Sequence, residues 1–307
     1  LHLKTKETIE GLSGEQVLDL LRLKWIAPLC DSLRAMPAAV VDSLEKAVQA
    51  LADKYITPYS VLSEQALAAR NDLCDMIDEL TGNDYDLCGL QELKIQIHSL
   101  QNLNKLYDFK KAMLRKMFPE KGSDVPAVRF KNFTDKWKKQ RLSYYLETSN
   151  QKNSQNKYVK ENVLSVSGEF GVVNQIRHLG RSYSGSVVTN YGIVGFGDVV
   201  YTKSPLKEAP YGIIKTNIGK PGIVSALYAV YHPKESVYSP FVQTYFDLDS
   251  RLNDYLRPII SKGAKNTINV GDDAALCGEV IFPSCEEQKA IYAFFDKLQK
   301  LILLSIQ

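Results

Sequence analysis

The spacing of apolar residues changes from helical to strand-like at Pro119 and Gly122, and this change constrains the fold most strongly. In residues 14–80 and 89–118, apolar residues recur at helical spacing, which predicts amphipathic helices. In residues 125–275, Val, Ile, Tyr and Phe are common and glycines recur at turns, which predicts short strands and hairpins with a helical passage. Since proline and glycine end helices, the sequence predicts an α+β chain with a helical front.

These patterns divide the chain into four predicted segments. Residues 1–88 contain three amphipathic stretches with short connections and are predicted to form an N-terminal helical bundle. Residues 89–118 are predicted to form one longer helix. Residues 119–283 are predicted to form a mixed α/β domain, and residues 284–307 a final helix.

The two helices that bracket the mixed domain both carry an apolar stripe. The final helix starts with Ser284 as its N-cap, and Glu287 completes a capping box. Because neither stripe can be buried by one helix alone, we expect an antiparallel or intermolecular helix pair. We expect lysine at Leu298 and Ile302 to disrupt assembly and to leave the mixed domain folded. The stripe positions are Leu93, Ile97, Leu100, Leu106, Met113, Met117, Ile291, Phe295, Leu298 and Ile302.

Charge is distributed unevenly along the chain. Residues 1–94 hold 9 basic and 16 acidic residues, a net charge of −7, whereas residues 126–275 hold 20 and 12, a net charge of +8. A basic domain favours an anionic partner, and nucleic acid is the first candidate. Solubility alone is the plainer alternative. The basic cluster at 110–116 fits either phosphate contact or stabilisation of a helix C-terminus.

The sequence contains no recognisable catalytic, nucleotide-binding or metal-binding motif. The stretch "GIVGFGDVV" (192–200) is read as turn glycines, because its glycine order is not that of a phosphate-binding loop and it opens no helix. The E-x-K form at 92–94 is read as a solvated pair, not a nuclease motif. Five scattered cysteines favour a reducing cytoplasm without structural zinc or disulfides. We therefore predict a non-catalytic binding protein with no cofactor and no membrane span.

Several side chains of the mixed domain have the chemistry of DNA contacts. Arginine favours guanine and asparagine or glutamine favours adenine in the major groove, while hydroxyls and cations suit phosphates. The candidates for base contact are Asn174, Gln175, Arg177 and Arg181. The candidates for backbone contact are Tyr183, Ser184, Tyr201, Lys203, Ser204, Lys207, Lys220, Lys265 and Asn266. For each residue taken singly, a solvated surface role is the alternative.

Residues 105–133, "KLYDFKKAMLRKMFPEKGSDVPAVRFKNF", resemble a junction in specificity subunits of type I restriction-modification enzymes, where a spacer helix meets a target-recognition domain. Later segments resemble the same family in the same order. They are "GDVVYTKSP" (197–205), "GKPGIVSALYAVYHP" (219–233), "GAKNTINV" (263–270) and "IFPSCEEQKAIYAFFDKLQKLI" (281–302). The resemblance covers about residues 95–307.

The front of the chain resembles a different subunit of these enzymes. The segments "LLRLKWIAPLCDSLRAMP" (20–37), "LADKYITPY" (51–59) and "DELTGNDYDLCGLQELK" (78–94) are similar to the C-terminal helical tail of the modification (methyltransferase) subunit. The chain thus resembles such a tail joined to half a specificity subunit, with one target-recognition domain and two spacer helices.

The resemblance implies a cytoplasmic DNA-specificity component without catalytic residues. It implies double-stranded DNA, the modification subunit and a restriction or motor subunit as partners, and S-adenosylmethionine bound in the partner methyltransferase. It also implies a homodimer, because one recognition domain reads only one half-site. The alternative is a helical assembly or decoy module that binds modification or specificity subunits without reading DNA. An independent enzyme ranks third.

Overall fold

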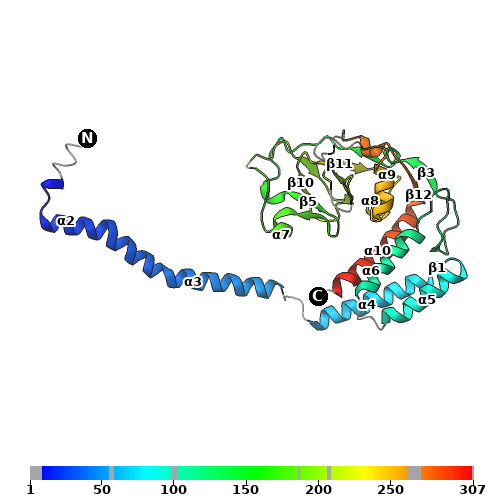
Figure 1. Cartoon of the computed structure of the whole chain (residues 1–307), viewed down its shortest axis with the longest axis horizontal. Coiled ribbons are helices and arrows are strands. Elements are labelled where there is room, and N and C mark those ends of the chain that lie inside the picture. The colour runs from blue at the N-terminus through cyan, green and yellow to red at the C-terminus, as the bar shows by residue number, and fades with distance from the viewer. Residues whose placement is uncertain are drawn as a thin grey trace. The chain divides into compact units, whose positions relative to one another are not determined.

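The computed structural model describes residues 9–54, 59–98, 103–185, 187–205, 209–260, 268 and 271–305 (Figure 1). The chain divides into two compact units, Leu1–Glu64 and Gln65–Gln307. Each unit is described below by itself.

The first unit is a helical run and not the predicted bundle. Helix α2 (Gly14–Leu21), a π-helical turn (Arg22–Ile26) and helix α3 (Ala27–Lys54) follow one another directly. A capping box with Ser13 and Gln16 starts the run. No described side chain between residues 9 and 54 is buried. The bundle prediction is wrong for these residues, because an amphipathic pattern specifies an apolar face without specifying what covers it.

The second unit contains two helices where one was predicted over residues 89–118. Helix α4 (Tyr59–Asp78) enters the unit at Gln65, and α5 (Asp84–His98) pairs with it through Lys94 and Asp78. Helix α6 (Leu103–Lys116) is separate and packs on α10 (Cys285–Leu304), where Lys110 Nζ donates to Gln299 Oε1 over 2.9 Å. The apolar stripe predicted over residues 89–118 is therefore divided between α5, which lies against α4, and α6, which packs on α10. The stripe position Leu100 lies outside the described residues.

The rest of the second unit is a mixed body of small antiparallel sheets and short helices, as predicted. A four-stranded sheet has the order β4-β11-β8-β9, and the two-stranded pairs are β1-β2, β3-β12, β5-β6 and β7-β10. The strands are β1 (Leu80–Thr81), β2 (Arg129–Phe130), β3 (Lys138–Arg141), β4 (Leu146–Thr148), β5 (Leu164–Ser167), β6 (Gly171–Asn174), β7 (Gly192–Val194), β8 (Val199–Thr202), β9 (Ile214–Thr216), β10 (Gly222–Val224), β11 (Tyr228–Pro233) and β12 (Glu279–Phe282). The short helices are α7 (Gln175–Leu179), α8 (Ser239–Phe246) and α9 (Asp249–Leu256), with 3-10 turns at Leu142–Tyr144, Lys160–Asn162 and Ala274–Leu276.

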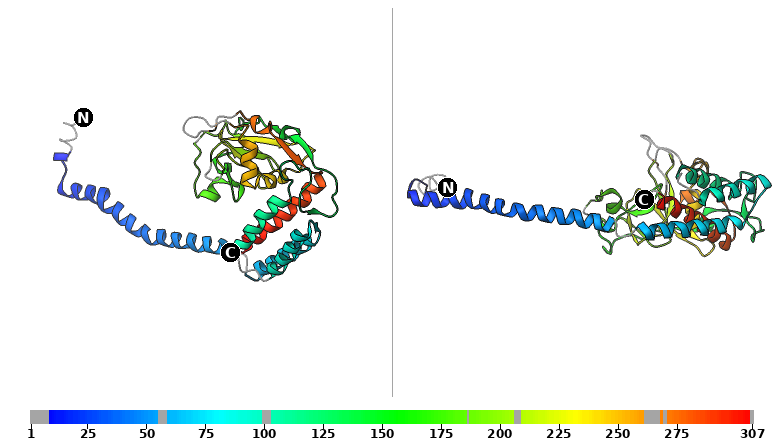
Figure 2. Two further views of the ribbon diagram at one scale, coloured as in Figure 1. Left: turned by 45° about the vertical axis from the view of Figure 1, so that its right-hand side comes forward. Right: turned by 90° about the horizontal axis from the view of Figure 1, so that it is seen from below.

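Helices α6 and α10 lie side by side and bury their stripes in the same core as the body (Figures 1 and 2). Phe118, directly before Pro119, is at the centre of an aromatic cluster, with ring centroids 5.7–6.1 Å away. Its ring neighbours are Trp137, Phe241, Tyr245 and Phe295. Helix α6 ends just before the border predicted at Pro119, but α6 and the body pack into one core across it.

The stripe residues are core residues of this chain. Ile97, Leu106, Met113, Met117, Ile291, Phe295, Leu298 and Ile302 are all buried, and Leu93 is half-buried against them. Of the two predicted alternatives, the described residues form the pair within the chain. The expectation that lysine at Leu298 and Ile302 would leave the body folded is wrong, because both side chains are fully buried in the core that α10 shares with the body.

A buried ion pair fastens the start of α10 to the body. Arg129 donates from Nε to Glu287 Oε1 over 2.7 Å and from Nη2 to Glu287 Oε2 over 2.8 Å. Arg129 Nη2 also donates to the Asp135 carbonyl, and Trp137 Nε1 donates to Glu287 Oε1. Ser284 caps the helix as predicted, but the carboxylate of Glu287 pairs with Arg129, so the capping box is only half formed.

We expect Glu287→Gln to lower the free energy of unfolding by about 3–5 kcal/mol, because it leaves the buried Arg129 guanidinium without its countercharge. Glu286→Gln is the matched control, since Glu286 is exposed in the same first turn. Urea denaturation followed by circular dichroism measures both. Equal stability of the two variants would contradict a fastening role for the pair.

Candidate nucleic-acid interface

Many cations of the second unit already have carboxylate partners. Lys110 lies 3.8 Å from Asp247 and Lys215 2.5 Å from the same carboxylate, and burial lowers the pKa of Lys110. Lys116, near the end of α6, pairs with Asp86. Two members of the 110–116 cluster therefore hold the fold together, and neither is free for a phosphate in this structure.

A second group of cations is exposed and forms no ion pair with a described carboxylate. These side chains, called the basic surface below, are Lys152, Lys157, Lys160, Arg177, Arg181 and Lys220. They lie on the connections before β5, between β6 and β7, and before β10. Between residues 150 and 224, the exposed carboxylates of the described part are Glu161 and Glu169. The surface is therefore net positive.

Asn153 holds one side of the basic surface in place. Its buried side-chain amide donates to the carbonyls of Tyr158 (2.8 Å) and Val188 (3.3 Å) and accepts from the Tyr158 amide (3.0 Å). A bridge between Lys152 and Gly192 joins the same loop to β7. Since both N–H groups and the oxygen of this amide bond to backbone, the loop that carries Lys152 and Lys157 has a defined path.

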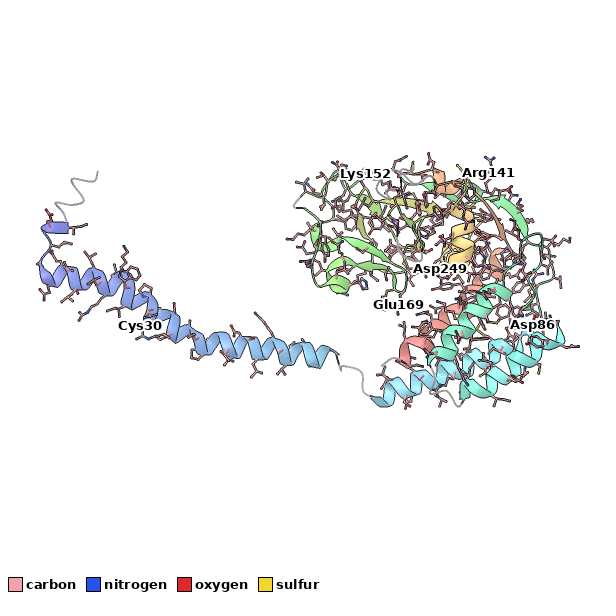
Figure 3. All side chains as sticks on the ribbon, in the orientation of Figure 1. Cys30, Asp86, Arg141, Lys152, Glu169 and Asp249 are labelled. Atoms are coloured by element: carbon pink, nitrogen blue, oxygen red, sulfur yellow. The ribbon has the colours of Figure 1, made fainter. Side chains whose placement is uncertain are left out.

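Asn174 holds the other side. Its side chain accepts from Arg177 N (3.1 Å) as the N-cap of α7 and donates to the Glu161 carbonyl (2.7 Å). A parallel bridge between Val163 and Ile223 brings the Lys160–Asn162 turn beside the start of β10. In Figure 1, α7, β5 and β10 lie together at one end of the body, and Figure 3 shows Lys152 far from the helix that carries Asp86.

The predicted base-contact residues fall into two kinds. The side chains of Asn174 and Gln175 are engaged locally: Gln175 Nε2 donates to Ser165 Oγ (3.1 Å), and its Oε1 accepts from the Tyr183 amide (2.8 Å). They shape the surface instead of presenting free amide edges. Arg177 and Arg181 are exposed, and the Arg181 guanidinium lies 4.6 Å from the Tyr183 ring centroid.

The predicted backbone-contact residues also divide. Tyr183 and Lys220 are exposed, and the half-buried Ser184 shares a hydrogen bond of 2.7 Å with Ser182. Lys203 is half-buried and pairs with Asp272 at 2.7 Å, and Ser204 is half-buried beside it. Lys207, Lys265 and Asn266 lie outside the described residues.

Tyr201 is a core residue, and its prediction as a phosphate contact is wrong. Its side chain is fully buried, its hydroxyl donates to the Tyr211 carbonyl over 2.6 Å, and burial raises its pKa. The reason is its strand: β8 pairs on both sides, with β11 and β9, and every residue of it is buried. A tyrosine hydroxyl alone does not reveal this environment.

Sequence reasoning missed three lysines of the basic surface. Lys152 and Lys157 lie within the polar stretch at 148–157, which was read only as a loop, and Lys160 follows it. Their spacing within nine residues, without a carboxylate until Glu161, was the available signal.

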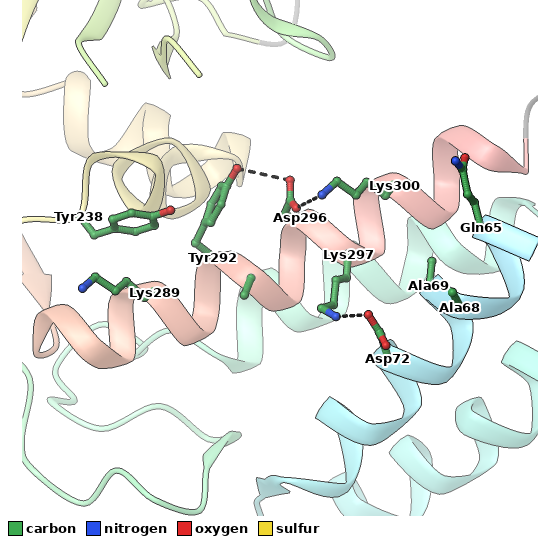
Figure 4. Close-up of a pocket in the computed structure, with 11 residues that line it drawn as sticks. Gln65, Ala68, Ala69, Asp72, Tyr238, Lys289, Tyr292, Asp296, Lys297 and Lys300 are labelled. Atoms are coloured by element: carbon green, nitrogen blue, oxygen red, sulfur yellow. Dashed lines mark hydrogen bonds and ion pairs between the residues drawn. The ribbon is translucent and has the colours of Figure 1, made fainter. Parts of the chain in front are cut away.

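A pocket of about 580 Å³ lies between α4 and α10, and two of the lysines that line it are ion-paired (Figure 4). Lys297 pairs with Asp72, and Lys300 pairs with Asp296 at 2.7 Å. The part of the chain that the structure describes contains no cluster of three or more His, Cys, Asp or Glu side chains suited to a metal ion. None of its helices is both long and apolar enough to cross a membrane.

No family model and no curated protein matches the sequence. Three solved structures are similar to the chain over 80–81% of its length. The HsdS subunit from Thermoanaerobacter tengcongensis has 16% identity and a TM-score of 0.42, with 52% of that chain covered. A chain from a study of complex assembly and conformational transition of the type I R-M system has 12% identity and a TM-score of 0.41, with 53% of that chain covered. The type I restriction-modification S subunit from M. genitalium has 10% identity and a TM-score of 0.37, with 52% of that chain covered. The chain spans about half the length of each.

Proposed function

We propose that the chain is a non-catalytic, sequence-specific DNA-recognition component of a type I restriction-modification system. The observation that carries this proposal is the basic surface, a set of exposed cations without carboxylate partners on a well-braced β framework. Cations of this kind release counterions when they bind phosphates, which supplies affinity for DNA. The family resemblance of residues 95–307 supports the same function.

In this proposal, the β-rich body reads one half-site and the helices dock the modification subunit. That subunit would flip and N6-methylate adenine, with S-adenosylmethionine in its own site. A restriction or motor subunit would join the same complex for cleavage. Two copies related by a two-fold axis would read two half-sites at a fixed separation.

The second candidate function is a helical assembly or decoy module. The helical run from α2 through the π-helical turn to α3 has exposed apolar side chains, which include Trp25, Leu29 and Met36. They favour this function, because such a surface suits a helical partner and needs no DNA. This candidate predicts binding to modification or specificity subunits without any affinity for DNA.

DNA binding by the whole chain separates the two functions. We expect fluorescence anisotropy to show binding to random-sequence duplex at low salt, with log affinity falling linearly with log salt. Selection from a random duplex pool should then enrich one short motif. Binding without a salt slope, or a pool without enrichment, would favour the assembly module.

Removing one cation of the basic surface should weaken binding to all sequences alike. We expect Lys152→Ala to reduce the slope of log affinity against log salt by about 1, as for one lost phosphate contact. Lys139→Ala is the control, because Lys139 is also exposed but lies on β3 and pairs with Glu279. An equal loss in both variants would assign binding to overall charge.

A two-fold assembly should be visible without DNA. We expect multi-angle light scattering to give about twice the chain mass at micromolar concentration. A single chain mass across the concentration series would contradict the dimer.

A further inference from the structure

The turn between β7 and β8 holds an aromatic side chain out into solvent. Phe196 is 72% exposed, although it sits between two glycines in a tight turn. Gly197 has a φ of 85°, a backbone conformation that strongly favours glycine. The Gly195 amide donates to Asp198 Oδ2 over 2.6 Å, so the turn closes on a buried carboxylate.

Asn217 joins this turn to the neighbouring one. Its buried side chain donates to the carbonyls of Gly195 (2.8 Å) and Lys220 (3.3 Å) and accepts from the Gly219 amide (3.1 Å). Its backbone amide donates to the Asp198 carbonyl, and its carbonyl accepts from Gly197, each over 2.8 Å. Residues 195–198 and 217–220 therefore form one braced unit, called the double turn below.

The double turn is fixed at its base as well. The second carboxylate oxygen of Asp198 lies 2.7 Å from His232 Nδ1 on β11. Gly222 packs so closely against the Lys160–Asn162 turn that a Cβ atom there would lie 2.4 Å from the Asn162 carbonyl oxygen. The double turn is therefore held beside the part of the basic surface that carries Lys160 and Lys220.

What the double turn displays is apolar and positive. Ile218, 49% exposed, accompanies Phe196, and Lys220 is exposed next to them. The antiparallel register of β7 with β10 places Val194, the last residue of β7, opposite Gly222, the first residue of β10. Phe196, after β7, and Lys220, before β10, therefore lie at the same end of this strand pair. The hydrogen bonds of the double turn hold the Phe196 ring exposed to solvent in one place. Such a pre-organised group loses little conformational entropy on binding.

We propose that the double turn enters a groove of duplex DNA, where Phe196 acts as an apolar wedge against a base step and Lys220 contacts a flanking phosphate. This inference rests on the proposed DNA-binding function and adds a contact to bases. Apolar side chains on rigid supports unstack flexible steps in this way, and glycine neighbours let the backbone approach closely. DNA fits better than a protein surface, because between residues 150 and 224 the exposed cations of the described part outnumber its exposed carboxylates, Glu161 and Glu169.

The test uses the whole chain and the duplex that it selects from a random pool. We expect Phe196→Ala to weaken binding to this duplex by about 5- to 150-fold, the range of base–aromatic contacts. The salt slope should not change, because no phosphate contact is removed. Lys220→Ala should instead reduce the slope by about 1. Phe196→Leu, which keeps an apolar side chain, should lose less than Phe196→Ala.

Leu227→Ala is the matched control. Leu227 is 59% exposed and lies after β10, at the strand end away from the double turn, so its loss should leave affinity unchanged. As a direct readout, 2-aminopurine placed in turn along the selected duplex should brighten at one step with the wild-type chain and not with Phe196→Ala.

The outcomes distinguish the two proposals. If the wild-type chain binds duplex DNA and Phe196→Ala binds equally well with no 2-aminopurine response, the wedge is overturned and the proposed function stands. If the wild-type chain binds no DNA, both fall. If Phe196→Ala weakens only binding that requires the modification subunit, the double turn faces a protein and the DNA assignment is overturned.

Discussion

The buried ion pair between Arg129 and Glu287 connects parts of the second unit that are distant in sequence. Both charges have lost most of their water, so the pair is favourable only with close geometry and further hydrogen bonds, which Asp135 and Trp137 provide. Because Glu287 lies in the first turn of α10, the pair fixes where this helix starts. The position of α10 then places its stripe in the core that it shares with α6 and the body.

The cations of the second unit differ in what compensates them. Where helices meet the body, cations such as Lys110 and Lys215 are placed around Asp247 and serve the fold. On β5, β6, β7 and β10, polar bracing comes instead from the neutral amides of Asn153 and Asn174. Amide bracing leaves the local cations uncompensated, and an uncompensated cation is what a phosphate backbone requires.

Sequence patterns predicted the elements better than their partners. The end of a helix just before Pro119, the cap at Ser284, the turn glycines at 192–200 and the mixed character of the body follow from local chemistry, and the structure has them. The amphipathic periodicity of residues 14–54 was also correct, but periodicity cannot say whether a face is covered. Burial of Tyr201 and Glu287 depends on strands and helices far away in sequence, so residue type alone pointed to the wrong role for both.

The double turn and the basic surface would contribute to binding in different ways. Exposed lysines and arginines attract any duplex and give affinity that salt removes, without reading sequence. A phenyl ring on a turn fixed by Asp198 and Asn217 responds instead to how easily a base step opens, which depends on sequence. Because the same framework holds both, the distance between phosphate contacts and wedge is set by the fold. Register on DNA would then follow from the rigidity of the body, not from the number of its charges.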